Sequence, residues 1–241
     1  VEGRAGERRW VVYAADGAYA LGDFDGRRFL ADSGKHRFNW GNAFYAAQTF
    51  NDVPPADGRR IQISWCRAAI PGMPFNQMMN FPVELTLRPT EEGLRLFAWP
   101  VREIRSLYRA EHAWSALRVR EGQNPLTGLR GNLFDVEAEI AVGDAAEVGF
   151  WLLGVPVVYR APEEQLHAGP CVAPLKQMDG RVRLRVLVDR TSREVFANGG
   201  RCYMPVAVIT PGEAQGLETI VRGGSAWFTS LVVRELYPAW E

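Results

Sequence analysis

Apolar and polar residues alternate in short runs along most of the chain, which is the pattern of half-buried β-strands. Clear examples are residues 60–65, 134–142 and 181–189, and residues 148–153 form a continuous apolar run typical of a buried strand. A last long run covers residues 226–236. Turn signals separate these runs at spacings of about 8–12 residues, so the pattern predicts an all-β fold built as a sandwich or as repeated small sheets.

The first hundred residues predict shorter strands. Residues 10–30 are expected to form a meander of three strands, because Asp25-Gly26 between aromatic runs is a hairpin signal. Residues 44–50 and 83–88 predict two further strands. The segment 70–74, with two prolines and a glycine, predicts a loop.

One stretch is a candidate helix, at residues 100–108. A domain boundary is therefore expected there. Residues 1–100 would form one unit and residues 108–241 another.

Within residues 181–189, arginine alternates with aliphatic residues. The alternation places Arg181, Arg183 and Arg185 on one face of a strand and the aliphatic side chains on the other. We interpret the arginine stripe as a solvated face and not as a phosphate site.

Composition excludes several classes of function. The chain has 28 basic and 28 acidic side chains among 241 residues, so its formal net charge is zero. It therefore lacks the basic footprint that nucleic acids and anionic membranes require, and neither is expected as a partner. The sequence also holds no apolar run of the length that crosses a bilayer as a helix.

Cysteine and histidine are scarce. Three cysteines (Cys66, Cys171 and Cys202) cannot form a disulfide scaffold, and three buried free thiols are favoured over a single bridge. The three histidines (His36, His112 and His167) lie far apart and do not form a metal-ligand pattern. We therefore expect neither a metal site nor a cofactor.

Three separated stretches resemble one family of enzymes. The first is residues 19–26 (YALGDFDG). The second is the series 44–50 (FYAAQTF), 60–65 (RIQISW), 71–82 (PGMPFNQMMNFP) and 84–88 (ELTLR). The third is residues 187–199 (LVDRTSREVFANG). In this order they resemble glycoside hydrolase family 32, the invertases, levanases, inulinases and related β-fructosidases.

The resemblance implies a five-bladed β-propeller followed by a β-sandwich. A blade takes about 40–50 residues, so the chain is expected to hold about two blades and a complete sandwich. In this family two carboxylates hydrolyse the fructosyl bond by the retaining scheme. The Asp-Pro-Asn, Arg-Asp-Pro and Glu-Cys motifs that carry this chemistry do not occur in the sequence. No catalytic residue is therefore expected in the chain, and the missing blades or a second subunit are expected as partners.

Three residues are expected to bind a fructose-containing saccharide by this resemblance. Trp65 would line the fructose pocket, the other interpretation being a core tryptophan of the blade. Tyr45 would reach the active site near the acid/base, and Gln48 would either join it or serve blade packing. Flat apolar faces mixed with hydrogen-bonding groups are what sugar sites require.

Four further positions bear on this reading. The family usually has acidic residues where this chain has Ala43 and Asn39, which predicts weaker polar contacts to the sugar or to the acid/base. Asp189 and Glu194 are two carboxylates close together in the sequence that could suggest a catalytic pair, but we interpret both as structural. Asp189 would accept backbone N–H bonds in a turn, and Glu194 would pair with an arginine.

The leading hypothesis is the C-terminal part of a glycoside hydrolase that acts on β-fructosides of the sucrose, inulin or levan type, inactive by itself. The alternative is a non-catalytic carbohydrate-binding or structural β-sandwich module. A third reading is a truncation without an independent role, which would be poorly soluble because isolated blades expose sheet edges.

Overall fold

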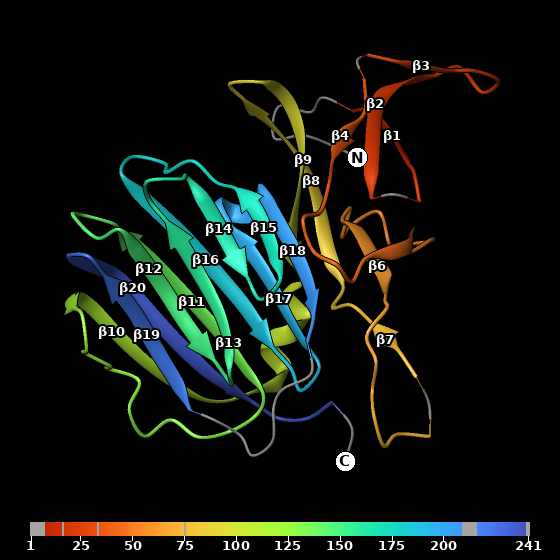
Figure 1. Cartoon of the computed structure of the whole chain (residues 1–241). Coiled ribbons are helices and arrows are strands. Elements are labelled where there is room, and N and C mark those ends of the chain that lie inside the picture. The colour runs from red at the N-terminus through yellow and green to blue at the C-terminus, as the bar shows by residue number, and fades with distance from the viewer. Residues whose placement is uncertain (1–7, 16, 33, 75, 209–215, 240–241) are drawn as a thin grey trace.

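The computed structural model describes residues 8–15, 17–32, 34–74, 76–208 and 216–239. Phe75 of the 71–82 motif lies outside these ranges. Within them the chain forms four β-sheets and two short 3₁₀ helices. Figure 1 shows two of the sheets stacked face to face, with the two N-terminal sheets standing beside one edge of the stack.

The two N-terminal sheets are small and antiparallel. The first contains β1 (Trp10–Tyr13), β2 (Ala18–Phe24), β3 (Phe29–Ala31) and β4 (His36–Arg37), and the order is β1-β2-β3 with β4 also paired to β2. The second contains β5 (Tyr45–Thr49), β6 (Arg60–Cys66), β7 (Met78–Met79), β8 (Val83–Thr90) and β9 (Gly93–Pro100). Its order is β5-β6-β8-β9 with β7 paired to β6, which is the four-stranded meander of a propeller blade.

The sandwich follows η1 (Arg102–Leu107). Its six-stranded sheet has the order β10-β20-β11-β16-β17-β18 and its five-stranded sheet the order β15-β14-β13-β12-β19. The strands of the first are β10 (Tyr108–Arg120), β11 (Phe134–Ala141), β16 (Arg181–Val188), β17 (Ser192–Ala197), β18 (Cys202–Ala207) and β20 (Ser225–Leu236). Those of the second are β12 (Glu147–Leu152), β13 (Val155–Arg160), β14 (Gln165–Ala168), β15 (Cys171–Pro174) and β19 (Leu217–Arg222). The second 3₁₀ helix, η2 (Asn198–Gly200), joins β17 to β18.

The sandwich core consists of the inward residues of both sheets. Along β16, Val182, Leu184 and Val186 are fully buried in this core, as the alternation predicts. Phe150 of the five-stranded sheet meets Phe228 of the six-stranded sheet edge to face, with ring centroids 5.9 Å apart. Such aromatic contacts add to the burial of apolar area that stabilises a sandwich.

A second core joins the sandwich to the N-terminal sheets. It contains apolar residues of β2, β8 and β9 together with Leu187, Phe196 and Tyr203 of the sandwich. Phe196 stacks on Tyr203 with ring centroids 4.9 Å apart, and Phe38 meets Tyr203 edge to face at 5.8 Å. At Gly200 the two parts touch so closely that a Cβ would lie 2.0 Å from the carbonyl oxygen of Ala98.

The helix expected over residues 100–108 is present as η1, a 3₁₀ helix. Ile104 is buried in the second core, and the remainder of the helix lies nearer the surface. Among the described residues, no helix is long and apolar enough to cross a membrane. The expected strands at 60–65, 134–142 and 181–189 are also confirmed. Several others were not predicted from the sequence, among them β9 and β10 and the sandwich strands β13, β14, β15, β18 and β19.

The interpretation of the arginine stripe is wrong for Arg185. Arg181 and Arg183 are half-exposed and both bind Glu139 of β11, as a solvated face would. Arg185 is buried: its Nε and Nη2 bind the two carboxyl oxygens of Asp135 at 3.0 and 2.8 Å, and its guanidinium lies 5.4 Å from the ring centre of Trp99. The start of the stripe faces water, while its end lies under strand β9 of the N-terminal sheet.

We predict that Arg185→Met lowers the free energy of unfolding by about 3–5 kcal/mol, because the buried Asp135 carboxylate loses the guanidinium paired with it and keeps the weaker hydrogen bond from the Tyr108 hydroxyl. The matched control is Arg181→Met on the same strand, whose half-exposed ion pair is worth about 0–1 kcal/mol. Urea denaturation measures both variants. Equal, small losses would contradict the burial of the Arg185–Asp135 pair.

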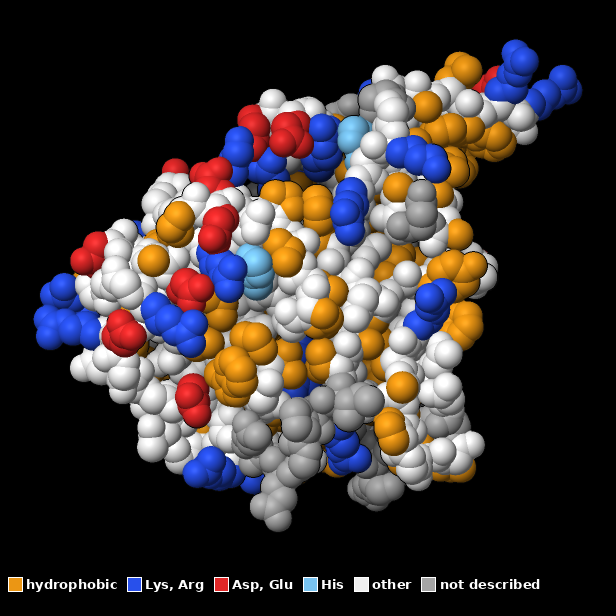
Figure 2. Space-filling view, in the orientation of Figure 1, with side chains coloured by type: hydrophobic (Ala, Val, Ile, Leu, Met, Phe, Trp, Pro, Cys, Tyr) orange, Lys and Arg blue, Asp and Glu red, His pale blue; other side chains and the backbone are white. Residues whose placement is uncertain are grey.

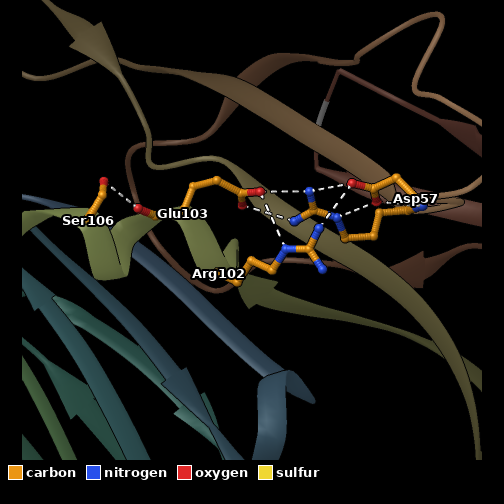
Figure 3. A network of polar contacts seen from close by, with 5 residues as sticks. Asp57, Arg102, Glu103 and Ser106 are labelled. Carbon is orange, nitrogen blue, oxygen red and sulfur yellow. Dashed lines mark hydrogen bonds and ion pairs between the residues drawn. The ribbon is translucent and has the colours of Figure 1, made fainter.

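A polar network fixes η1 to the loop between β5 and β6 (Figure 3). Arg59 donates to Asp57 and to Glu103, with Nη1 and Nη2 at 2.9 and 2.7 Å from the Glu103 oxygens. Arg102 adds a contact to Asp57 at 3.3 Å. The hydrogen bonds from Arg59 lower the pKa of both Asp57 and Glu103 to about 2.

This network predicts a defined acid dependence of stability. A carboxyl whose pKa is lower in the folded state stabilises the fold above its unfolded pKa of about 4, and the stabilisation disappears as the pH falls toward 2. Arg59→Met should therefore flatten the loss of stability between about pH 4.5 and 2. Denaturation at several pH values tests this, with Arg27→Met, at an exposed position, as the control expected to match the wild type.

Candidate functional site

Tyr45 and Trp65 stand side by side on the second N-terminal sheet. They are directly paired across β5 and β6, and their ring centroids lie 5.9 Å apart at an interplanar angle of 59°. Both rings remain more than one third exposed, at 37% and 38%. Two of the three residues expected to bind the saccharide thus form one exposed aromatic pair.

Gln48 joins this pair through a β-bulge. Residues three apart on a regular strand point to opposite faces, so Gln48 would turn away from Tyr45. Ala46, however, has a left-handed backbone with φ of 45°, and the pairing shifts between Tyr45 and Gln48. Gln48 therefore pairs with Ile63, two residues from Trp65, and lies on the same face as both aromatic rings.

Two residues that sequence reasoning did not single out complete this face. Met79 pairs with Trp65 and is half-exposed, and the Arg67 guanidinium lies 5.4 Å from the ring centre of Tyr45. We call Tyr45, Gln48, Trp65, Arg67 and Met79 the aromatic face. Figure 2 shows hydrophobic side chains gathered over the N-terminal sheets.

The opposite side of β6 is polar but buried. Asn80 lies beneath it with 2% of its surface exposed. Its Nδ2 donates to the Ala43 carbonyl and to Ser64 Oγ, both at 2.7 Å, and its N–H donates to the Ser64 carbonyl at 2.9 Å. A single amide therefore ties together the segments that carry Tyr45 and Trp65. The only sequence signal for this role was the position of Asn80 inside the 71–82 motif.

The two positions at which the resemblance leads us to expect acidic residues are both buried. Ala43 is fully buried in a small cluster with Cys66 and Ala68, against which Ala207 of β18 packs. Asn39 is 7% exposed and forms a bridge with Tyr203 of the sandwich. In this chain the two positions therefore serve packing between the N-terminal sheets and the sandwich.

Asp189 and Glu194 differ in their surroundings. Asp189 caps its turn as expected, because its Oδ1 accepts the Arg190 N–H at 2.7 Å. The expectation that Glu194 pairs with an arginine is wrong: its oxygens accept the Phe81 N–H at 2.7 Å and the Tyr203 hydroxyl at 2.9 Å. Complete burial raises the pKa of Glu194 to about 8.

All three cysteines are free and buried, as favoured by the sequence. Burial raises the pKa of Cys66 and Cys202 to about 12, so neither thiol is a reactive nucleophile. In the part of the chain that the structure describes, no cluster of three or more His, Cys, Asp or Glu side chains could hold a metal ion.

Comparison with known proteins identifies the family. The model of the "Glycosyl hydrolases family 32 N-terminal domain" matches residues 12–100, and that of the "Glycosyl hydrolases family 32 C terminal" region matches residues 103–235. The chain belongs to glycosyl hydrolase family 32. The resemblance stated from the sequence is thus confirmed over nearly the whole chain.

Curated relatives of this family 32 chain include levanases and inulinases. A levanase of Bacillus subtilis (strain 168) is 28% identical over an alignment of 282 positions, gaps included. The alignment covers 100% of this chain and 42% of the levanase. An extracellular exo-inulinase of Aspergillus niger is 23% identical, over 92% of this chain and 48% of the inulinase. The chain therefore spans about half the length of the curated relatives it matches.

Solved structures confirm the fold. The exo-inulinase from Aspergillus awamori superimposes with a TM-score of 0.79 at 20% identity, covering 92% of this chain and 50% of the inulinase. A fructofuranosidase from Schwanniomyces occidentalis complexed with fructosylnystose gives a TM-score of 0.78 at 18% identity, over 92% and 53% of the two chains. As predicted, the fold of the family 32 chain is part of a β-propeller, whose sheets do not close, followed by a β-sandwich.

The bulge at Ala46 gives a testable property of the aromatic face. An alanine in the left-handed region is strained by about 1 kcal/mol, which glycine avoids. Ala46→Gly should therefore leave stability unchanged or raise it by up to about 1 kcal/mol. The matched control is Ala47→Gly in the same strand, which should lower stability by about 0.5–1 kcal/mol. Denaturation curves in which both substitutions destabilise equally would contradict the bulge.

Proposed function

We propose that this family 32 chain is the C-terminal part of a glycoside hydrolase that acts on β-fructosides of the sucrose, inulin or levan type. The observation that carries the proposal is the aromatic face, in which Tyr45, Trp65 and Gln48 come together on one side of a sheet. Two exposed aromatic rings beside an amide match the alternating apolar faces and hydroxyl groups of a sugar. The names of the matched levanases and inulinases point to the same substrates.

The aromatic face would bind and orient the fructosyl unit and would not itself break the bond. The exposed rings of Trp65 and Tyr45 offer apolar surfaces to a furanose ring, and the amide of Gln48 both donates and accepts hydrogen bonds. The retaining mechanism needs a nucleophilic carboxylate and a second carboxyl as acid/base. We propose that both come from propeller blades that this sequence does not contain, so that the chain alone is inactive.

Exposed apolar surface supports a partner of this kind. Trp10 and Leu30 of the first N-terminal sheet are 57% and 63% exposed, and Phe50, which follows β5 of the second, is 47% exposed. Strand β5 also ends its sheet and leaves one edge unpaired among the described strands. We propose that further propeller blades cover these surfaces and that residues 1–100 and 108–241 are the two domains of this part.

A hydrolysis assay tests the proposal. The pure chain should release no fructose from sucrose, inulin or levan, and co-expression with the preceding blades of a family 32 levanase should restore release. Hydrolysis by the pure chain would contradict its inactivity. Saccharide binding that never yields hydrolysis, even with the blades supplied, would instead favour a non-catalytic carbohydrate-binding module.

The aromatic face predicts a specific loss of saccharide binding. Trp65→Ala should weaken binding of levan oligosaccharides by at least about 1 kcal/mol, or roughly fivefold or more in Kd, because a stacking surface is removed. Tyr45→Ala should act in the same direction. Calorimetry measures both, with Trp227→Ala on the sandwich strand β20 as the control. Equal affinity in the wild type and in Trp65→Ala would reject this binding surface.

A further inference from the structure

The segment in front of the aromatic face is attached to the edge of the sandwich. Residues 40–43 run along β18, where the Ala43 N–H donates to the Pro205 carbonyl at 3.1 Å. There is no room for a side chain at Gly41, since a Cβ would lie 1.9 Å from the same carbonyl oxygen. Strand β5, which begins at Tyr45, therefore directly follows a segment that is hydrogen-bonded to the sandwich.

The segment behind the aromatic face is held by one carboxyl group. Oε1 of Glu194 on β17 accepts the Phe81 N–H at 2.7 Å. The residue before Phe81 is Asn80, whose amide supports Ser64 of β6. Glu194 therefore holds the backbone at Phe81. The preceding residue, Asn80, carries the side chain that supports β6, the strand of Trp65.

A continuous chain of polar contacts leads from Glu194 to β6. The Tyr203 hydroxyl lies 2.9 Å from Glu194 Oε2 and also contacts the Ser64 side chain. Asn80 Nδ2 donates to Ser64 Oγ at 2.7 Å. Ser64 is the neighbour of Trp65 in the sequence, so a displacement at Glu194 reaches the aromatic face through directly bonded groups.

The surroundings of Glu194 oppose its ionisation. The titratable groups that face it are Tyr203 of β18, Cys66 of β6 and Asp189 of the turn before β17. None of these is a cation, and the adjacent Arg193 donates to backbone carbonyls such as that of Leu152. Burial favours the neutral acid and outweighs the hydrogen bonds from Phe81 and Tyr203, which favour the anion, so the pKa of Glu194 is raised to about 8.

We propose that Glu194 is a positioning residue for the aromatic face: its carboxyl group holds Phe81, and through Asn80 and Ser64 it keeps Trp65 beside Tyr45. Loss of the proton places a negative charge near Asp189 and Cys66, and it strengthens the hydrogen bonds that the Phe81 N–H and the Tyr203 hydroxyl donate. Both donors are then drawn toward the carboxylate, which changes the position of the segment and strand that they hold. For its saccharide the inference rests on the proposed function, whereas the positioning is a property of the protein alone.

Nuclear magnetic resonance of the ¹⁵N-labelled chain tests this. The indole N–H signal of Trp65, assigned by its loss in Trp65→Phe, is followed between about pH 6 and pH 10. In the wild type it should shift with a midpoint of about 8. In Glu194→Gln, which keeps an acceptor for Phe81 but cannot ionise, the signal should stay at its low-pH position.

Controls separate this effect from general changes. Asp189→Asn should retain the titration of Trp65, and the indole signal of Trp227 on β20 should not titrate in any variant. Glu194→Ala removes both acceptor oxygens and should move the Trp65 signal at every pH. If Glu194→Ala does not fold, the titration of Glu194→Gln still tests the positioning role of Glu194.

A Trp65 signal that does not titrate in the wild type, or that titrates equally in Glu194→Gln, would overturn the inference. A folded Glu194→Ala whose Trp65 signal matches that of the wild type at low pH would also overturn it. Calorimetry with levan oligosaccharides is a separate arm. Absent binding by the wild type contradicts the proposed function but leaves the titration of Trp65 as an independent test of positioning.

Discussion

Strand β17 is buried on both of its faces, and the arrangement of the chain depends on this double burial. One face places Val195 in the sandwich core, while the other places Phe196 against the N-terminal sheets. Phe196 stacks on Tyr203 of the neighbouring strand, and together they extend an apolar surface that residues of β8 and β9 cover. Because burial of apolar area is the main favourable contribution to folding, the N-terminal sheets and the sandwich stabilise each other.

Burial on both faces also forces polar groups of β17 into dry surroundings. Such groups must find hydrogen-bond partners, since an unpaired buried polar group is costly. Arg193 donates to backbone carbonyls on the sandwich side, and Glu194 accepts from Phe81 and Tyr203 on the other. The contact that lets Glu194 be buried is therefore the same contact that fixes the segment under Trp65.

Local pattern predicted about half of the strands and missed the others. The alternation in β6, β11 and β16 was visible because one face of each strand is buried and the other is polar. Strand β10 (Tyr108–Arg120) has one face partly buried and the other exposed, and its inward positions include Ala110 and His112, so its alternation is weak. The arginine stripe of β16 shows the same limit, since alternation reveals which face Arg185 occupies but not that Trp99 covers it.

The sequence by itself determined the all-β class, the strand periodicity and the likeness to family 32, because these depend on local residue order and on short motifs. It also indicated Trp65, Tyr45 and Gln48 as candidate saccharide-binding residues. Tertiary structure alone decided that a bulge turns Gln48 toward the two aromatic rings, that Arg185 is buried, and that Glu194 binds Phe81 instead of an arginine. Glu194 and Phe81 are 113 positions apart. Such contacts follow from strand register and sheet packing, which residue order does not display.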